Sequence, residues 1–319
     1  FAWVENVYSD SIIPARISQM ILVYSSFTWL GMVLFGKDAW LKHGEAFSLA
    51  FGLLAKFAPT EVRLIGDEST AAARRTSNTD FSEAQDESGI VKRVEREINL
   101  RPFATGLLDI GKVSTSEMLF VLLLLATVTF DGFTATMPWI NIQNASEKYM
   151  PNIMFISTLG LILSALIFVV VYCGFCALMS LTGGSRLNAL DLGKAFVYTL
   201  IPIALAYHVA HFLLFLLIQG QLIFPLASDP FGFGWDLLGT ANYRLNFQPV
   251  SPSVYWFVSV IAIVVGHIIA VFLSHSIALR VHSTRRQALH SQYPMLVLMV
   301  GYTTASLWII TQPMYMPAM

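Results

Sequence analysis

Two histidines lie three residues apart in the middle of a long apolar stretch. His208 and His211 belong to the segment FVYTLIPIALAYHVAHFLLFLLIQGQ, and His267 belongs to a second apolar segment, VVGHIIAVFLSH. Residues three apart share one face of a helix, and the three histidines fall near the middle of their segments. If the two segments form neighbouring antiparallel helices, the three imidazoles can meet at one depth. Gly266 would then let the helices approach closely.

Three interpretations of these histidines remain open. Imidazole is the commonest protein ligand for Zn, Cu and non-haem Fe, so His208, His211 and His267 would form a three-ligand metal site with an open position. One histidine from each helix would instead hold a haem b by axial ligation. In the third interpretation the rings are structural and bond to Ser, Tyr or backbone groups. Because ionisable groups within membrane spans usually mark function, we expect metal binding or catalysis.

Asp131, in TVTFDGFTATMPW, is the acid that lies well inside an apolar segment. It would serve as a fourth metal ligand or as the carboxylate that orients a histidine ring. Alternatively, it lies close enough to the membrane interface to be hydrated. Tyr207 and Tyr302 could donate to an oxyanion or simply pack, and the sequence does not decide between these roles.

Other polar residues of the apolar segments have simpler expected roles. Pro202 removes a backbone hydrogen bond and can bend the helix that carries His208. Gln219 and Gln221 could line a polar entrance at the outer end of that helix. His282 and His290 are expected at the surface, near lipid headgroups.

The composition defines the class of protein that must position these residues. The chain has 319 residues, of which 55% are hydrophobic and 12% are charged, and its mean hydropathy is +0.64. Soluble domains have about 25% charged residues, so this chain has too few to cover a soluble surface. The net charge of −1 gives no indication of nucleic-acid binding.

The fold class predicted from these features is all-α, a polytopic transmembrane helix bundle that forms a single domain over residues 1–319. Apolar runs of about 20 residues match the thickness of the hydrocarbon core, and only helices or closed barrels satisfy their backbone in lipid. Six spans are predicted: Ile17–Phe35, Met118–Met137, Ile153–Leu181, Ala195–Ile223, Val254–Leu279 and Met295–Ile310.

Three further segments complete the predicted organisation. KDAWLKHGEAFSLAFGLLAKFAP is too short to cross and predicts an amphipathic or re-entrant helix, with Asp38 as its cap and Pro59 as its end. Residues 60–113 are expected to form a partly disordered cytoplasmic loop. Residues 224–252 are expected to form an extracytoplasmic aromatic loop, either as a cap on the bundle or as an ordinary aromatic belt.

The distribution of basic residues predicts the orientation. With residues 37–117 inside the cell, the short inner connections hold five basic residues and the short outer connections hold two, Lys148 and Arg244. This asymmetry follows the positive-inside rule and predicts a multi-pass protein of the cell's inner (plasma) membrane with residues 37–117 in the cytoplasm. The opening FAWVENVYSD lacks the features of a signal peptide, and we expect further helices upstream of it.

Several stretches resemble bacterial multi-pass membrane proteins of the fenitrothion hydrolase family. The resemblance covers nearly the whole chain except residues 64–98. It rests on FGKDAWLKHGEAFSLAFGLLAKFAP, RPFATGLL, LLLLATVTFDGF, YHVAHFLLFLLIQGQLIFPLASDPFGFGWDLLGTANY and RRQALHSQYPMLVLMVGYT.

The resemblance implies a hydrolase that acts on phosphoric triester bonds and releases a nitrophenol. A metal bound by His208, His211 and His267 would activate water for this reaction, or one histidine would act as a general base. Two alternatives remain: a metal- or haem-binding subunit of a larger membrane complex, and a transporter for a small solute. The expected partners are membrane lipids and further membrane subunits.

Overall fold

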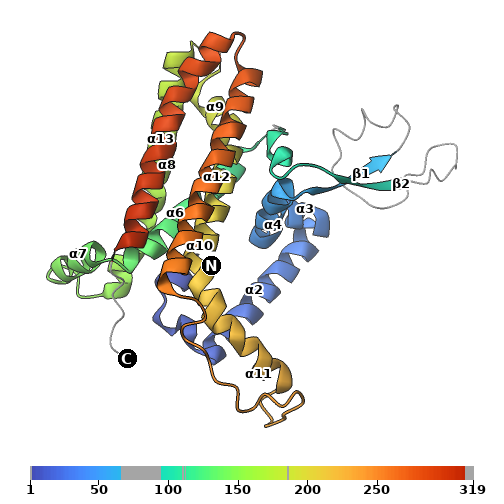
Figure 1. Cartoon of the computed structure of the whole chain (residues 1–319), viewed down its shortest axis with the longest axis vertical. Coiled ribbons are helices and arrows are strands. Elements are labelled where there is room, and N and C mark those ends of the chain that lie inside the picture. The colour runs from blue at the N-terminus through green and yellow to red at the C-terminus, as the bar shows by residue number, and fades with distance from the viewer. Residues whose placement is uncertain (1, 66–94, 110, 112, 185–186, 313–319) are drawn as a thin grey trace. The chain divides into compact units, whose positions relative to one another are not determined.

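The computed structural model describes residues 2–65, 95–109, 111, 113–184 and 187–312. It is built almost entirely of helices (Figure 1). Six of them are long and apolar enough to cross a membrane, so the all-α, multi-pass membrane fold is confirmed. The structure divides into two compact units, Phe1–Tyr8 with Ile110–Met319, and Ser9–Asp109.

The first unit contains five of the predicted spans. They are α6 (Thr115–Thr134), α8 (Ile153–Gly183), the run Ala189–Ser228, α12 (Pro252–Val281) and α13 (Arg285–Thr311). The short helices α1 (Ala2–Asn6) and α7 (Met137–Glu147) accompany them.

Polar side chains fix where these helices begin. Four of the helices have an N-cap whose side chain accepts a hydrogen bond from a backbone N–H of the first turn: Ser114 for α6, Asn152 for α8, Ser251 for α12 and Thr284 for α13. Such caps satisfy donors that have no partner within the helix. Gly184, with φ of +54°, ends α8 in the left-handed conformation that glycine favours.

The run Ala189–Ser228 is not one continuous helix. It consists of α9 (Ala189–Phe196), the 3₁₀ turn η3 (Val197–Leu200), α10 (Ile201–Gln219), η4 (Gly220–Leu222) and α11 (Ile223–Ser228). Pro202 lies in the first turn of α10, where its missing N–H costs nothing. Pro202 thus follows a 3₁₀ turn at the start of α10 and does not lie inside the helix, and the histidines lie beyond it on regular α-helix.

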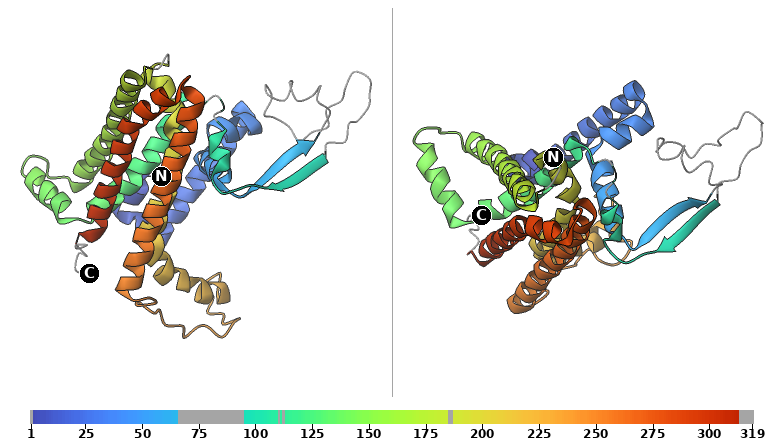
Figure 2. Two further views of the ribbon diagram at one scale, coloured as in Figure 1. Left: turned by 45° about the horizontal axis from the view of Figure 1, so that its top comes forward. Right: turned by 90° about the horizontal axis from the view of Figure 1, so that it is seen from above.

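The long helices of this unit form a ring. They pack in the order α6, α8, α13, α12, α10 and back to α6, and α6 also contacts α13 (Figure 2). At Gly266 of α12 an added Cβ would lie 2.5 Å from the Cβ of Ala206 and 2.8 Å from the carbonyl oxygen of Pro202. The prediction that Gly266 permits close helix approach is confirmed.

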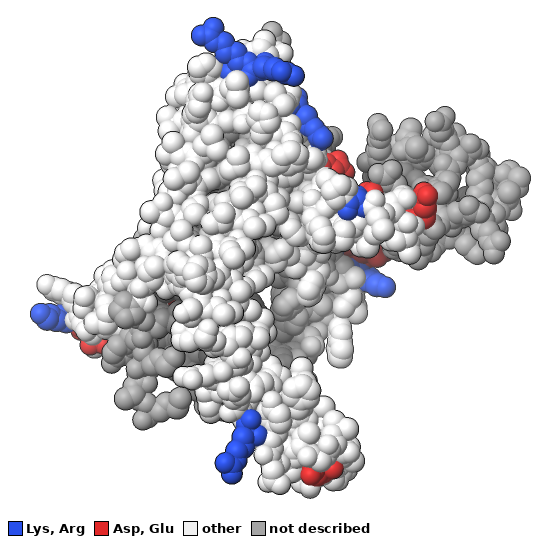
Figure 3. Space-filling view, viewed as in Figure 1, with Lys and Arg blue, Asp and Glu red and all other residues white. Residues whose placement is uncertain are grey.

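Figure 3 shows where charges lie on one face of this ring. Lys and Arg side chains gather at the end where α12 turns into α13, and the face formed by the described parts of these two helices is otherwise uncharged. The turn contains Arg280, Arg285 and Arg286. His290 is exposed there as expected, but His282 is buried, so its predicted surface position is wrong. Its Nε2 lies against Gly183 of α8, where the absence of a side chain makes room.

The loop after α11 is organised by hydrogen bonds. Asp229 accepts from the backbone N–H groups of Phe233 and Gly234. Gln221 donates to the carbonyl of Asn246 at 2.9 Å and accepts from its backbone N–H at 2.9 Å, so it holds the loop instead of lining an entrance.

The aromatic side chains of this loop stack on one another. Phe231, Phe233 and Trp235 have ring centroids 5.4 to 5.8 Å apart, and all three remain exposed. This exposure favours an aromatic belt over a cap packed on the bundle.

The second unit is built around the span α2 (Pro14–Phe35), followed by α3 (Lys37–His43) and α4 (Ala46–Phe57). The single short helix predicted here is thus two helices. Asp38 lies in the first turn of α3, whose N-cap is Gly36, so its predicted capping role is wrong. Pro59 follows directly after the C-cap of α4, as predicted.

Trp40 joins α3 to α2. Its ring lies over Gly31, where an added Cβ would come within 2.3 Å of it. The ring also stacks on Phe35 and meets Phe27 edge-on.

A β-hairpin lies where the sequence predicted only a loop. Strands β1 (Thr60–Ile65) and β2 (Glu95–Leu100) pair antiparallel, with Thr60 opposite Leu100 and Ile65 opposite Glu95. The 3₁₀ turn η2 (Thr105–Leu108) follows. Residues 66–94, where disorder was predicted, lie outside the described residues.

Arg101 anchors the hairpin to the end of α4. Its guanidinium donates to the carbonyl oxygens of Ala55, Lys56 and Ala58, and it pairs with Glu61 at 3.3 Å. These carbonyls are the acceptors that a helix C-terminus leaves unsatisfied.

Glu45 is the side chain on which the start of α4 depends. It accepts from the backbone N–H groups of Phe47 at 2.9 Å and Ser48 at 2.5 Å, and from the hydroxyl of Tyr24 on α2. Burial by itself would raise the pKa of Glu45. The hydrogen bonds from Ser48, Tyr24 and Phe47 outweigh burial and lower the pKa to about 2.

We expect Glu45→Gln to destabilise the protein by about 1 kcal/mol at neutral pH, the usual cost of losing a helix cap. Because the pKa is lowered from its ordinary value of 4.5 to about 2, the stabilisation is complete above pH 4.5 and is lost as the pH falls toward 2. Thermal unfolding in detergent at several pH values measures this difference. Glu147→Gln, at an exposed glutamate, is the control, and a pH-independent difference for Glu45→Gln would contradict the prediction.

Candidate functional site

His211 and Asp131 meet between α10 and α6. The Nε2 atom of His211, on α10, lies 2.6 Å from Oδ2 of Asp131, on α6, and both side chains are mostly buried. A carboxylate can only accept, so Nε2 of His211 carries the proton and donates it. In neutral His211 the lone pair is therefore on Nδ1. A carboxylate that fixes the tautomer of a histidine is the arrangement found in general-base catalysts.

Aromatic rings hold His211 in place. Tyr207, one turn earlier on α10, stacks on His211 with centroids 6.0 Å apart and planes 10° apart. Phe212 meets the same ring edge-on at 4.8 Å. The Tyr207 side chain is 1% exposed, and its hydroxyl has no hydrogen-bond partner among the described residues. A buried donor without a partner is unusual and leaves a hydrogen bond for a ligand to complete.

Gly132 makes room for this hydroxyl. An added Cβ at Gly132 would lie 2.7 Å from the Tyr207 hydroxyl oxygen, 3.0 Å from Ile309 and 3.7 Å from Cε1 of His211. The glycine directly after Asp131 therefore lets the tyrosine and histidine of α10 approach the backbone of α6.

His208 and His267 are each fixed by their own helix. Nδ1 of His208 donates to the carbonyl of Ala204 at 2.8 Å, and Nδ1 of His267 donates to the carbonyl of Ile263 at 2.7 Å. Because a carbonyl only accepts, the neutral rings carry their lone pairs on Nε2. Nε2 of His267 is buried and has no partner in the described part of the chain.

The structure connects His267 to His211 through two tyrosines. Tyr302 of α13 lies 6.3 Å from the ring of His267 and 6.4 Å from the ring of Tyr207, and Tyr207 stacks on His211. His208 contacts the side of Phe212, at 6.1 Å. No hydrogen bond joins any two of the three histidines.

Of the four residues predicted for a metal site, the structure thus pairs two, His211 and Asp131. Within the described ranges no group of three or more His, Cys, Asp or Glu side chains is arranged to hold a metal ion. Of the two roles predicted for Asp131, the observed hydrogen bond fits that of a carboxylate that orients a histidine ring. Metal ligation by these residues stays a prediction.

Glu5 is a member of this neighbourhood that the sequence did not indicate. Its helix, α1, packs against α6 and α8, and Trp3 donates to the Thr158 hydroxyl at 2.9 Å. Although Glu5 is exposed at the surface, partial burial of its carboxyl, followed by the charge of Asp131, raises its pKa, while His211 opposes this effect. The proximity of Glu5 to Asp131 and His211 depends on the packing of α1 on α6, which the sequence does not indicate.

The fold and the site define a multi-pass helical membrane protein in which a histidine and an aspartate from two spans are hydrogen-bonded. Comparisons of the chain with protein-family models, curated proteins and solved structures find no match.

We expect Gly132→Ala to destabilise the protein by about 1–3 kcal/mol because the new methyl overlaps the Tyr207 hydroxyl. Tyr207→Phe removes that oxygen, so the cost of Gly132→Ala should fall by roughly 1 kcal/mol in the Tyr207→Phe background. Thermal unfolding of the two single variants and the double variant measures the coupling. Gly174→Ala, at a helical glycine with free space around its Cα, is the control, and additive effects would contradict the proposed contact.

Proposed function

We propose that this protein is a membrane hydrolase in which His211, oriented by Asp131, activates water to attack an uncharged ester. The observation that carries the proposal is the 2.6 Å hydrogen bond between His211 and Asp131 across two spans. A buried histidine–carboxylate pair among apolar helices is costly and usually functional. The resemblance to fenitrothion hydrolases supports phosphoric triesters as the substrate class.

The proposed reaction needs no group beyond water and the chain. The lone pair on Nδ1 of His211 takes a proton from water while the water oxygen forms a bond to phosphorus. The P–O bond to the aryl group breaks, and the phenolate leaves with the bonding electrons. The proton held by His211 then passes to the phenolate or to solvent, which regenerates neutral His211. Asp131 stabilises the imidazolium that forms in between.

Tyr207 has a position suited to a supporting role. Its buried hydroxyl has no protein partner among the described residues and its ring stacks on His211. We propose that it donates to the phosphoryl oxygen, where negative charge develops during attack.

A second candidate function, a metal- or haem-binding subunit, is favoured by one observation. Nε2 of His267 is buried, carries a lone pair and has no partner among the described residues. Histidines that ligate metals commonly donate their other nitrogen to a carbonyl in this way. His267 would then be the protein's ligand to Zn, Cu, Fe or a haem b.

We propose that the protein lies in a bacterial inner membrane with residues 37–117 in the cytoplasm, because Arg280, Arg285 and Arg286 gather at one end of α12 and α13. Asn242 precedes α12 and Ser283 follows it, so the two residues lie beyond opposite ends of this span, and both are exposed. We expect a membrane-impermeant maleimide to label Asn242→Cys in intact cells and Ser283→Cys only after permeabilisation. The reverse pattern would overturn this orientation.

We expect the purified protein to release 4-nitrophenolate from diethyl 4-nitrophenyl phosphate. His211→Asn should lower kcat by about 10²–10⁴-fold, the usual contribution of a general base, and Asp131→Asn should also lower it, because the tautomer of His211 is no longer fixed. His290→Asn, at an exposed histidine, is the control. Absence of hydrolysis by the wild type, or full activity of His211→Asn, would refute the proposal.

The same sample distinguishes the second candidate. A visible absorption band, or about one equivalent of a transition metal that is lost in His267→Asn, would support a metal- or haem-binding subunit. A colourless, metal-free and active protein would exclude it.

A further inference from the structure

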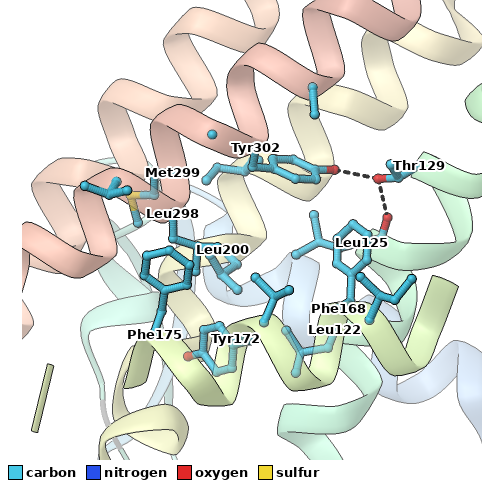
Figure 4. Close-up of a pocket in the computed structure, with 16 residues that line it drawn as sticks. Leu122, Leu125, Thr129, Phe168, Tyr172, Phe175, Leu200, Leu298, Met299 and Tyr302 are labelled. Carbon is cyan, nitrogen blue, oxygen red and sulfur yellow. Dashed lines mark hydrogen bonds between the residues drawn. The ribbon is translucent and has the colours of Figure 1, made fainter. Parts of the chain in front are cut away.

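A cavity of about 410 Å³ lies among α6, α8, α13 and the start of α10, and Tyr302 is one of the residues that line it (Figure 4). Its walls are almost wholly apolar and include Leu122, Leu125, Phe168, Phe175 and Met299. Sites for small molecules have volumes of about 300–1,000 Å³, so this cavity has room for one small apolar group.

The mouth of the cavity lies on the side of the bundle. Ile167 and Val171 of α8 and Val297 of α13 line it, and their exposed fractions are 57%, 40% and 62%. These residues lie within spans, where exposed apolar surface faces hydrocarbon. An apolar molecule dissolved in the bilayer can therefore enter without crossing water.

One wall of the cavity carries polar groups. The hydroxyl of Thr129 donates to the carbonyl of Leu125 at 2.7 Å, so the Tyr302 hydroxyl, 2.9 Å from Thr129, must be the donor in their shared bond. Figure 4 shows this chain of bonds at the edge of the apolar lining.

Tyr302 links the cavity to the histidine–aspartate pair. Its ring lines the cavity and also lies 6.4 Å from the ring of Tyr207, which stacks on His211. Tyr207 and His211 do not themselves line the cavity. Tyr302 is therefore the residue through which a molecule in the cavity would be adjacent to the histidine–aspartate pair.

We propose that this cavity is the specificity pocket of the hydrolase and binds the apolar group of an uncharged ester taken up from the bilayer. The proposal rests on the proposed function. It assigns the substrate class as lipid-soluble esters that carry one hydrocarbon chain or ring. Charged esters are excluded because the lining offers no partner for a charge.

Gly301 provides a way to fill the cavity without disturbing the bundle. It lines the cavity, and an added Cβ there would meet nothing within 4 Å. Gly174, on α8, also has free space around its Cα and does not line the cavity. Both variants introduce a leucine into a helix. Gly301→Leu places it in the cavity, whereas Gly174→Leu places it outside the cavity.

The test uses a phosphoric triester that has one 4-nitrophenyl group and one alkyl chain bearing a diazirine. Illumination followed by mass spectrometry identifies the residues that the chain touches. We expect label on Phe168, Phe175 or Met299 in the wild type and in the inactive His211→Asn, since binding does not need hydrolysis. Gly301→Leu should reduce this label and raise KM roughly tenfold, whereas Gly174→Leu should change neither.

The outcomes separate the pocket from the catalytic proposal. Hydrolysis with the label elsewhere, or a label that Gly301→Leu leaves unchanged, overturns the pocket while the proposed function stands. Label in the cavity without hydrolysis by the wild type overturns the proposed function and with it the role of the cavity as a substrate pocket.

Discussion

The candidate site depends on one hydrogen bond, between His211 on α10 and Asp131 on α6. Removing a carboxylate from water is expensive unless it is paired, and the apolar ring of helices offers Asp131 few alternatives. The bond therefore fixes how α10 faces α6, and Gly132 allows the approach that it requires. The stacked Tyr207 and the edge of Phe212 then leave His211 one orientation.

The rest of the ring keeps that pair in a setting where it can act. Gly266 brings α12 against α10, and the backbone carbonyls of Ala204 and Ile263 fix the other two histidines. These bonds give the rings different surroundings. His211 donates to a carboxylate, which supports its proposed role as a base, whereas Nε2 of His267 is buried without a partner among the described residues. Tyr207 and Tyr302 lie between them and connect the pair to the apolar cavity.

Part of this organisation was predictable because it depends on local properties of the chain. Apolar runs of about 20 residues predicted the six spans, which the structure confirms, and Pro59 and Gly266 acted as predicted. Asp38 is not a cap because the segment forms two helices: Gly36 is the N-cap of α3, and Glu45 caps α4 by accepting hydrogen bonds from its backbone N–H groups. The hairpin of β1 and β2 was missed because its two strands are short, polar and far apart in the sequence.

The sequence by itself determined the class of protein, since hydropathy and the scarcity of charge are properties of composition and do not need a fold. It also singled out His208, His211, His267 and Asp131, because an ionisable residue within an apolar run is conspicuous without any neighbour. Only the tertiary structure decided which of them meet. Partners such as Asp131 and His211, or Tyr302 and His267, lie on different helices, and the rotation of each helix about its axis is set by packing and by small residues at the contacts. For the same reason the sequence did not indicate that Glu5 lies near Asp131, or that the apolar cavity is present. Both depend on the packing of several helices.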